Sequence, residues 1–116
     1  MPSPEASELP LEIDVHSVKQ LIDTHADFLL LDCRESDEVA TAQIEGASWI
    51  PMNELPNRVQ ELDADQGRRI VVHCHGGVRS LRVAHWLRQQ GFAMAQSMAG
   101  GIDAWSLSID SQVPRY

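Results

Sequence analysis

A cysteine followed by a glycine-rich turn and an arginine is the feature of this sequence that points most directly to chemistry. Cys74 opens the stretch Cys74-His75-Gly76-Gly77-Val78-Arg79-Ser80, which follows the apolar residues 70–72. Two glycines let a loop turn tightly and direct successive backbone N–H groups inward. Arg79 adds a positive charge and a fork of donors, and a helix after the loop would add its free N-terminal N–H groups. We therefore expect a cradle for an anion, with Cys74 at its head.

Such surroundings favour the thiolate form of a cysteine, which is the nucleophilic form. A thiolate in an anion cradle fits covalent catalysis by attack of sulfur on the substrate. The alternative is a buried structural cysteine beside a turn, but the order of strand, glycines, arginine and helix favours catalysis. A metal site made of His73, Cys74 and His75 is a weaker hypothesis, because neighbouring residues of an extended strand point to opposite faces. We predict no metal site.

The elements that would hold this loop alternate between strands and helices. Residues 28–33 and 69–74 are short, continuous apolar runs, which is typical of strands buried on both faces of a parallel sheet. Weaker strands are expected at 11–14, 47–50 and 93–98, and helices from 15 and at 35–43, 53–62, 80–90 and 102–107. The alternation predicts an α/β layered fold with a mainly parallel sheet. Ligands bind at the carboxyl ends of such strands, where Cys74 lies.

The length of the chain predicts a single domain with no room for a second. The chain has 116 residues, and a domain takes roughly 100–200. We expect a flexible Pro/Ser/Glu-rich tail at 1–11, one domain at 12–107 and an irregular tail at 108–116. The net charge of −8 argues against nucleic-acid binding, and the lack of an apolar run of about twenty residues argues against a membrane span. An acidic N-terminus without a secretory pattern and only two cysteines predict a cytoplasmic protein.

The charges are unevenly distributed along the chain. Residues 66–102 contain no acid but five arginines and three histidines. Two interpretations remain open here: a solvated face that happens to lack acids, or a local positive field that attracts an anion.

Four motifs, in order, resemble the rhodanese-like sulfurtransferases. The stretch at 74–80 is similar to their Cys-x-x-Gly-x-Arg-Ser loop, and the other three matches are Leu31-Asp32-Cys33-Arg34-Glu35, Ile44-Glu45-Gly46-Ala47 followed by Ile50-Pro51, and Gly100-Gly101-Ile102-Asp103-Ala104-Trp105. The resemblance covers about residues 12–107. Two departures stand out: Ala42-Gln43 replaces a usual Gly-His, and Cys33 replaces a common Val.

The resemblance implies a rhodanese-like three-layer fold, in which helices flank a five-stranded, mainly parallel sheet. It implies that Cys74 takes a sulfur atom from thiosulfate or a protein persulfide and passes it to a thiophilic acceptor. Arg79 would bind the donor's sulfonate, and the N–H groups of residues 75–80 would stabilise the persulfide. Ser80 would either donate its hydroxyl to the persulfide or cap the helix. No cofactor is implied, and the expected partners are a small anionic sulfur donor and a sulfur-donor or sulfur-acceptor protein.

Two other functions compete with sulfur transfer as explanations of this sequence. Cysteine phosphatases of related fold use His-Cys-x₅-Arg, whereas only four residues separate Cys74 from Arg79. The shorter loop has one amide fewer and suits a single sulfur better than a phosphate, and it offers no obvious acid for a leaving alkoxide. A non-catalytic binding module would be expected to have lost the cysteine.

Outside the loop, Asp32 and Arg34 are interpreted as structural, as an ion pair. Trp49 and Trp105 are expected in the core or in a pocket wall. Cys33 is either a small buried residue or a resolving cysteine for Cys74, and the relative register of the two strands decides whether a disulfide is within reach.

Overall fold

The computed structural model describes residues 9–116, so most of the expected flexible segment 1–11 lies outside the described residues. Its strands form one sheet in the order β1-β5-β4-β2-β3, and every pairing in it is parallel. The strands are β1 (Glu12–Ile13), β2 (Phe28–Asp32), β3 (Ser48–Trp49), β4 (Arg69–His73) and β5 (Ala95–Met98). The α-helices are α1 (Val15–Asp23), α2 (Ser36–Thr41), α3 (Leu55–Arg58), α4 (Val78–Gln89) and α5 (Gly101–Ser108). The predicted α/β fold with a parallel sheet is confirmed.

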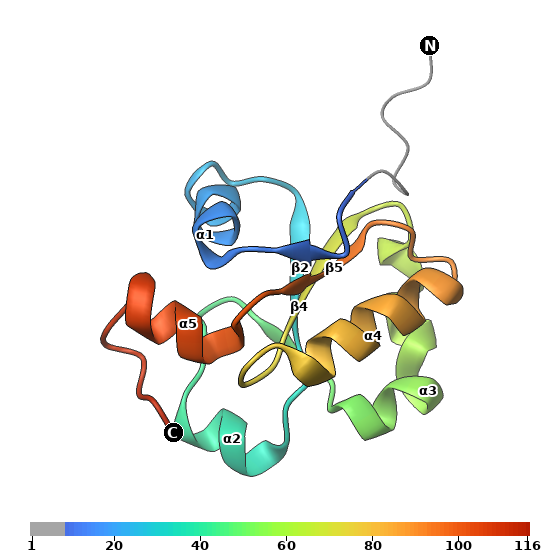
Figure 1. The fold of residues 1–116 in the computed structure, drawn as a ribbon. Coiled ribbons are helices and arrows are strands. Elements are labelled where there is room, and N and C mark those ends of the chain that lie inside the picture. Colours follow the sequence, from blue (N-terminus) through green and yellow to red (C-terminus); the bar gives the residue numbers. More distant parts are fainter. Residues whose placement is uncertain (1–8) are drawn as a thin grey trace.

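Helices cover both faces of the sheet. In Figure 1, α1 and α5 lie on one side of the strands, and α3 and α4 lie on the other. Successive side chains of β4 alternate between these sides: Ile70 and Val72 pack with the residues of α3 and α4, whereas Val71 packs with those of α1 and α5. All three are fully buried. The continuous apolar runs of the central strands follow directly from this double burial.

Local sequence fixes where the helices begin. The Asp14 carboxylate accepts the N–H of Ser17 at 2.8 Å and caps α1. At α2, the backbone N–H of Glu35 donates to the Glu38 carboxylate at 3.1 Å as one half of a capping box. This second cap matters for the site, because it fixes the backbone that carries Glu38.

The single helix expected over 53–62 is wrong. The chain there forms a 3₁₀ turn (Met52–Glu54), the four-residue α3 and a second 3₁₀ segment (Val59–Asp65). The backbone of Arg58 leaves the helical region with φ −125°, and its guanidinium binds Glu54 and Glu61 on either side. Because Leu55 and Leu62 are both still buried, the apolar spacing that suggested a continuous helix is satisfied without one.

The carboxyl ends of β2 and β4 lie at the same end of the molecule, where α2 and the last residues of the chain also lie (Figure 1). Residues 109–116 form no helix or strand. Val113 is nevertheless buried in the cluster with α1 and α5, so this segment is held against the domain. Among the described residues, no helix is long and apolar enough to cross a membrane.

Candidate active site

Cys74 lies immediately after β4, at the base of the glycine-rich loop. Its thiol sulfur accepts the backbone N–H of Gly77 at 3.1 Å and that of Ser80 at 3.3 Å. Because α4 begins at Val78, the Ser80 N–H belongs to the first helical turn, where backbone donors have no partner within the helix. These two donors, together with the positive end of the helix, stabilise negative charge on the sulfur.

Ser80 faces the cysteine and does not cap the helix. The Cys74 thiol donates to Ser80 Oγ at 3.4 Å, while the residue at the cap position is Gly77, which has no side chain to offer. Ser80 Oγ also lies 2.7 Å from Ser97 Oγ on β5, and either hydroxyl can be the donor of that bond. If Ser97 donates, the Ser80 hydroxyl is free to donate to an anionic sulfur.

Two glycines at special backbone positions allow the loop to close. Gly77 has φ +105°, and a Cβ there would lie 3.2 Å from the Gly100 nitrogen. Gly101 has φ +61°, and a Cβ there would overlap the carbonyl oxygens of Cys74 and His75. Because position 101 has no Cβ, the N-terminus of α5 comes close enough for the N–H of Ile102 to donate to the Cys74 carbonyl at 2.9 Å. The Gly100-Gly101 motif therefore positions the loop that carries Cys74.

The remaining loop residues line the rim. Val78 is 70% exposed, which is unusual for a large apolar side chain, and Gly76 is also exposed. The His75 ring packs against the ring of Tyr116 with centroids 4.3 Å apart. Of the amides of residues 75–80, those of Gly77 and Ser80 reach the Cys74 sulfur in the described structure.

Arg79 is committed to an ion pair. Its guanidinium donates to both oxygens of Glu38 at 2.6 and 2.8 Å. Hydrogen bonding from Arg79 is the main reason why the pKa of Glu38 falls to about 2, and the Tyr116 hydroxyl adds a bond to the same carboxylate at 2.8 Å. The cation at the cradle is therefore neutralised by a residue of α2 unless a substrate displaces it.

Comparison with known proteins gives the family. The chain matches the family model described as Rhodanese-like domain over residues 14–108.

The chain belongs to the rhodanese-like family. It is 37% identical over 95 residues to a sulfurtransferase of Allochromatium vinosum, covering 82% of this chain and 87% of that one. It is 35% identical over 94 residues to a putative sulfurtransferase of Bacillus subtilis, covering 81% and 88%. The solved structure of the human single-domain sulfurtransferase is similar, with a TM-score of 0.76, 25% identity and coverage of 86% and 98%. These relatives support a general sulfurtransferase function for this rhodanese-like domain.

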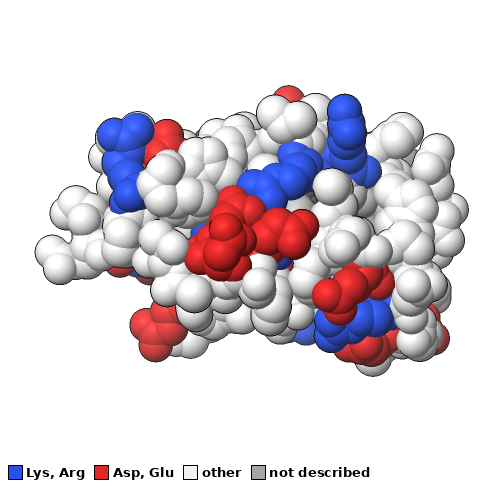
Figure 2. Space-filling model, turned by 90° about the horizontal axis from the view of Figure 1, so that it is seen from below, with Lys and Arg blue, Asp and Glu red and all other residues white. Residues whose placement is uncertain are grey.

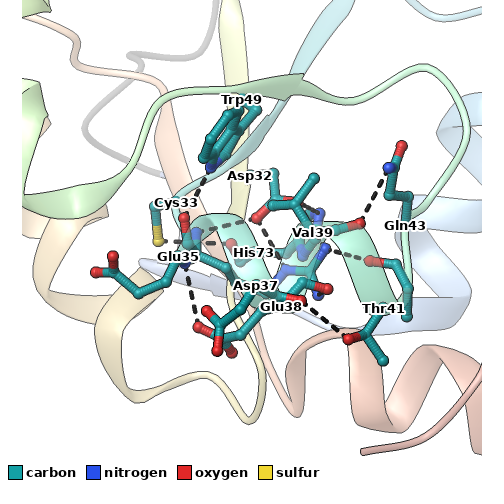
Figure 3. A network of polar contacts seen from close by, with 12 residues as sticks. Asp32, Cys33, Glu35, Asp37, Glu38, Val39, Thr41, Gln43, Trp49 and His73 are labelled. Carbon is teal, nitrogen blue, oxygen red and sulfur yellow. Dashed lines mark hydrogen bonds and ion pairs between the residues drawn. The ribbon is translucent and has the colours of Figure 1, made fainter.

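A polar network joins the end of β2 to α2 in this rhodanese-like domain (Figure 3). The Arg34 guanidinium is fully buried and donates to both oxygens of Asp32 at 2.9 and 2.8 Å, so the predicted structural ion pair is confirmed. It also donates to the Ala42 carbonyl at 2.6 Å and to the Tyr116 hydroxyl at 2.9 Å. Since Tyr116 in turn donates to Glu38, the network ends on the partner of Arg79.

The two tryptophans differ in their surroundings. Trp105 of α5 is buried in the core, as expected. Trp49 is 41% exposed, and its indole N–H donates to the Arg34 carbonyl at 2.7 Å. It therefore fixes the backbone that follows Cys33 (Figure 3).

The arginines of residues 66–102, the segment without acidic residues, do not form a single patch of unpaired positive charge. Arg68 binds Asp27 and Asp65, and Arg79 binds Glu38. Arg88 donates to the backbone carbonyls of Ala95 and Leu9, so it holds the chain and not a ligand. Figure 2, which views the molecule from the end of α2 and the loop, shows acidic and basic side chains in contact there. Arg69 donates to the Gln96 side chain at 2.8 Å, and Arg82 is exposed at the surface.

Glu38, Tyr116 and Ser97 are the site residues that sequence reasoning missed. Glu38 had a local signal, since it lies three residues after Glu35, the spacing of a capping box. Ser97 and Tyr116 had none, because only the folded sheet and the packed segment 109–116 bring them to the loop.

Cys33 lies beside Cys74. It is fully buried in the same apolar cluster, on the α3 and α4 side of the sheet. His73, the residue before Cys74, points to the other side of the sheet, with its Nε2 3.8 Å from the Asp32 carboxylate. Both cysteines are free thiols.

Proposed function

We propose that this protein transfers a sulfane sulfur through a persulfide on Cys74. The observation that carries the proposal is the placement of the Cys74 sulfur between the N–H groups of Gly77 and Ser80. A thiolate held by two amide donors at a helix N-terminus is stabilised as a nucleophile, and the same donors can hold the anionic outer sulfur of a persulfide.

The first half of the reaction loads the enzyme. The Cys74 thiolate attacks the outer sulfur of thiosulfate, a new S–S bond forms, and the bond between the two sulfurs of thiosulfate breaks. Sulfite leaves with that electron pair and carries two negative charges, and one negative charge remains on the Cys74 persulfide. With a protein persulfide as the donor, the leaving group is the donor's thiolate.

The second half transfers the sulfur and restores the cysteine. A nucleophilic acceptor, such as a thiolate or cyanide, attacks the outer sulfur, and the bond to Cys74 breaks. The electron pair returns to Cys74, which is again the thiolate held by Gly77 and Ser80. The Ser80 hydroxyl lies 3.4 Å from the Cys74 sulfur and 2.7 Å from the Ser97 hydroxyl, so when Ser97 donates to Ser80, Ser80 would donate to the anionic sulfur in both halves.

Arg79 is the group of the loop that would bind an anionic donor. Its guanidinium is paired with Glu38 in the free protein, so a sulfonate must share or displace that carboxylate. Because a donor must compete with Glu38 for Arg79, the ion pair favours a donor that binds strongly. Such a donor is either a dianion such as thiosulfate or a protein that also contacts the exposed residues of the loop.

The geometry gives less support to phosphate-ester hydrolysis. That reaction needs an acid to protonate the leaving alkoxide. Glu38 is the carboxyl group next to the loop arginine, and Arg79 lowers its pKa to about 2, so it carries no proton at neutral pH.

The experiment is the intact mass of the protein before and after exposure to thiosulfate. We expect a gain of one sulfur atom, and we expect cyanide or dithiothreitol to remove it. Cys74→Ser should gain nothing, whereas Cys33→Val, which removes the other buried thiol, should still gain one sulfur.

A persistent gain of sulfur in Cys74→Ser would overturn the proposal. So would rapid hydrolysis of an aryl phosphate by the wild type that depends on Cys74, because the cradle would then serve phosphate.

A further inference from the structure

Cys33 is a buried nucleophilic group that sulfur transfer through Cys74 does not use. It follows the last residue of β2, as Cys74 follows the last residue of β4. It lies in the same apolar cluster as Cys74, enclosed by residues that include Ile50 and Leu55. A valine would fill such a position equally well as far as packing is concerned, so the sulfur itself needs another explanation.

The register of the sheet places the two cysteines opposite each other. β2 and β4 are parallel neighbours with Asp32 paired to His73, so one step further along both strands brings Cys33 to Cys74. The N–H of Cys33 donates to the His73 carbonyl at 3.1 Å, which is the last bond of the Asp32–His73 pair and holds Cys33 next to the end of β4. There is no two-residue stagger between them.

This placement is compatible with a disulfide. Neighbouring strands lie about 4.8 Å apart, and the Cα atoms of a disulfide are usually about 4.4–6.8 Å apart. Directly opposite residues of parallel strands point to the same face, and the shared cluster of Cys33 and Cys74 agrees with this. Both residues lie just beyond the strand ends, and their carbonyls accept the N–H groups of Met52 and Ile102, so the sulfurs would approach by rotation of the two side chains.

Cys33 stays out of the sulfur-transfer cycle. Burial raises the pKa of its thiol to about 12, and the neighbouring Cys74 adds to the rise. It is therefore a neutral thiol at physiological pH and a poor competitor for the sulfur that Cys74 carries. Its thiol points to the His73 carbonyl, with sulfur and oxygen 3.5 Å apart (Figure 3).

We propose that Cys33 and Cys74 form a reversible disulfide when a peroxide oxidises Cys74, so that Cys33 acts as a resolving cysteine that protects the nucleophile. This inference rests on the proposed function in that Cys74 must be the reactive thiolate. It adds a covalent modification to the same site.

The chemistry balances in two steps with hydrogen peroxide as the oxidant. The Cys74 thiolate attacks one peroxide oxygen, the O–O bond breaks, hydroxide leaves, and Cys74 becomes a sulfenic acid. The Cys33 thiol then attacks the Cys74 sulfur, the S–O bond breaks, and the hydroxyl group leaves with the Cys33 proton as water. Oxidation of Cys74 removes the thiolate charge that helped to raise the pKa of Cys33, which favours this second step. Two molecules of a thiol reduce the disulfide afterwards.

The test treats the wild type, Cys33→Val and Cys33→Ala with dilute hydrogen peroxide and follows intact mass and peptide maps without reduction. We expect the wild type to lose two hydrogen atoms, to give a linked peptide pair containing Cys33 and Cys74, and to regain sulfur transfer in dithiothreitol. We expect both variants to gain two oxygen atoms on Cys74 and to stay inactive in dithiothreitol, because the sulfinic acid is not reduced by thiols.

A parallel sample of each protein is treated with thiosulfate, which keeps the two proposals separable. If every protein gains one sulfur from thiosulfate but peroxide drives Cys74 to the sulfinic acid equally fast in all three, the resolving role is wrong and the proposed function stands. If no protein gains sulfur, the proposed function fails, whatever the peroxide result.

Discussion

At the scale of single residues, Glu38 and an anionic ligand would compete for the guanidinium of Arg79. The guanidinium sits on the Glu38 carboxylate, which shows that a planar, two-oxygen anion fits its fork of donors. A sulfonate group presents oxygens with similar spacing. We therefore expect the Glu38 carboxylate to lie where the sulfonate of a donor would bind.

Replacing Arg79 with alanine should lower kcat/KM for thiosulfate by more than about tenfold, because a charged hydrogen bond contributes roughly 1.5–3 kcal/mol. Arg82→Ala removes an equal charge one turn further along α4 and should lower kcat/KM much less, since the Arg82 side chain is exposed and its charge acts through water and not by contact, an effect that weakens further as salt rises. Steady-state kinetics at low and high salt make the comparison. Equal losses from both substitutions would show that Arg79 acts through the general field and not by contact.

At the scale of elements, α5 holds the loop that carries Cys74, and the close approach depends on a glycine at position 101. The Ile102 N–H donates to the Cys74 carbonyl, and the Asp103 N–H donates to the His75 carbonyl at 3.1 Å. This turns the carbonyl side of the loop toward α5 and leaves the N–H side for the sulfur. The orientation of the cradle thus depends on an element that contributes no side chain to it.

Gly101→Ala should displace the loop, since its Cβ would overlap the Cys74 and His75 carbonyls and alanine is strained at φ +61°. We expect a loss of about 1–3 kcal/mol in the free energy of unfolding and a loss of most of the sulfur-transfer rate. Gly67→Ala is the matched control, because a Cβ there has no atom within 4 Å. Urea unfolding and thiosulfate kinetics measure both effects. Unchanged kinetics in Gly101→Ala would show that α5 does not orient the loop.

The elements that could be predicted from the sequence are those whose signal is local. The apolar runs of β2 and β4 and the glycines beside Cys74 identified the central strands and the loop. The continuous helix over 53–62 was a wrong prediction, because the burial of Leu55 and Leu62 fits a broken chain as well as a helix. The roles of Ser97 and Tyr116 could not be predicted, since both depend on contacts with residues far away in the sequence.

At the scale of the whole molecule, the two apolar layers enclose a histidine without a hydrogen-bond partner in the described structure. The His73 ring is fully buried, and neither of its nitrogens is bonded. Burial lowers the pKa of His73 from 6.5 to about 4. The unfolded chain therefore binds a proton on His73 at a higher pH than the folded protein does.

This difference predicts that the protein loses stability in mild acid. As the pH falls from 6.5 toward 4, protonation favours the unfolded chain, and stability should drop by about 3 kcal/mol on account of His73. His73→Leu keeps the volume and removes the proton site, so it should flatten that part of the profile. Urea unfolding between pH 4 and 8 measures both proteins. An equally steep fall in His73→Leu would assign the acid sensitivity to other groups.

The contact of Tyr116 with His75 and Glu38 gives the molecule a built-in point of attachment. The Tyr116 side chain lies next to the residue that follows Cys74, whereas residues 9–12 lie at the opposite end of the domain (Figure 1). A partner fused or tethered there would meet Cys74 at an effective concentration set by the tether and not by its concentration in solution. If Cys74 carries sulfur as proposed, a short tether at this residue would make its transfer to a tethered acceptor intramolecular.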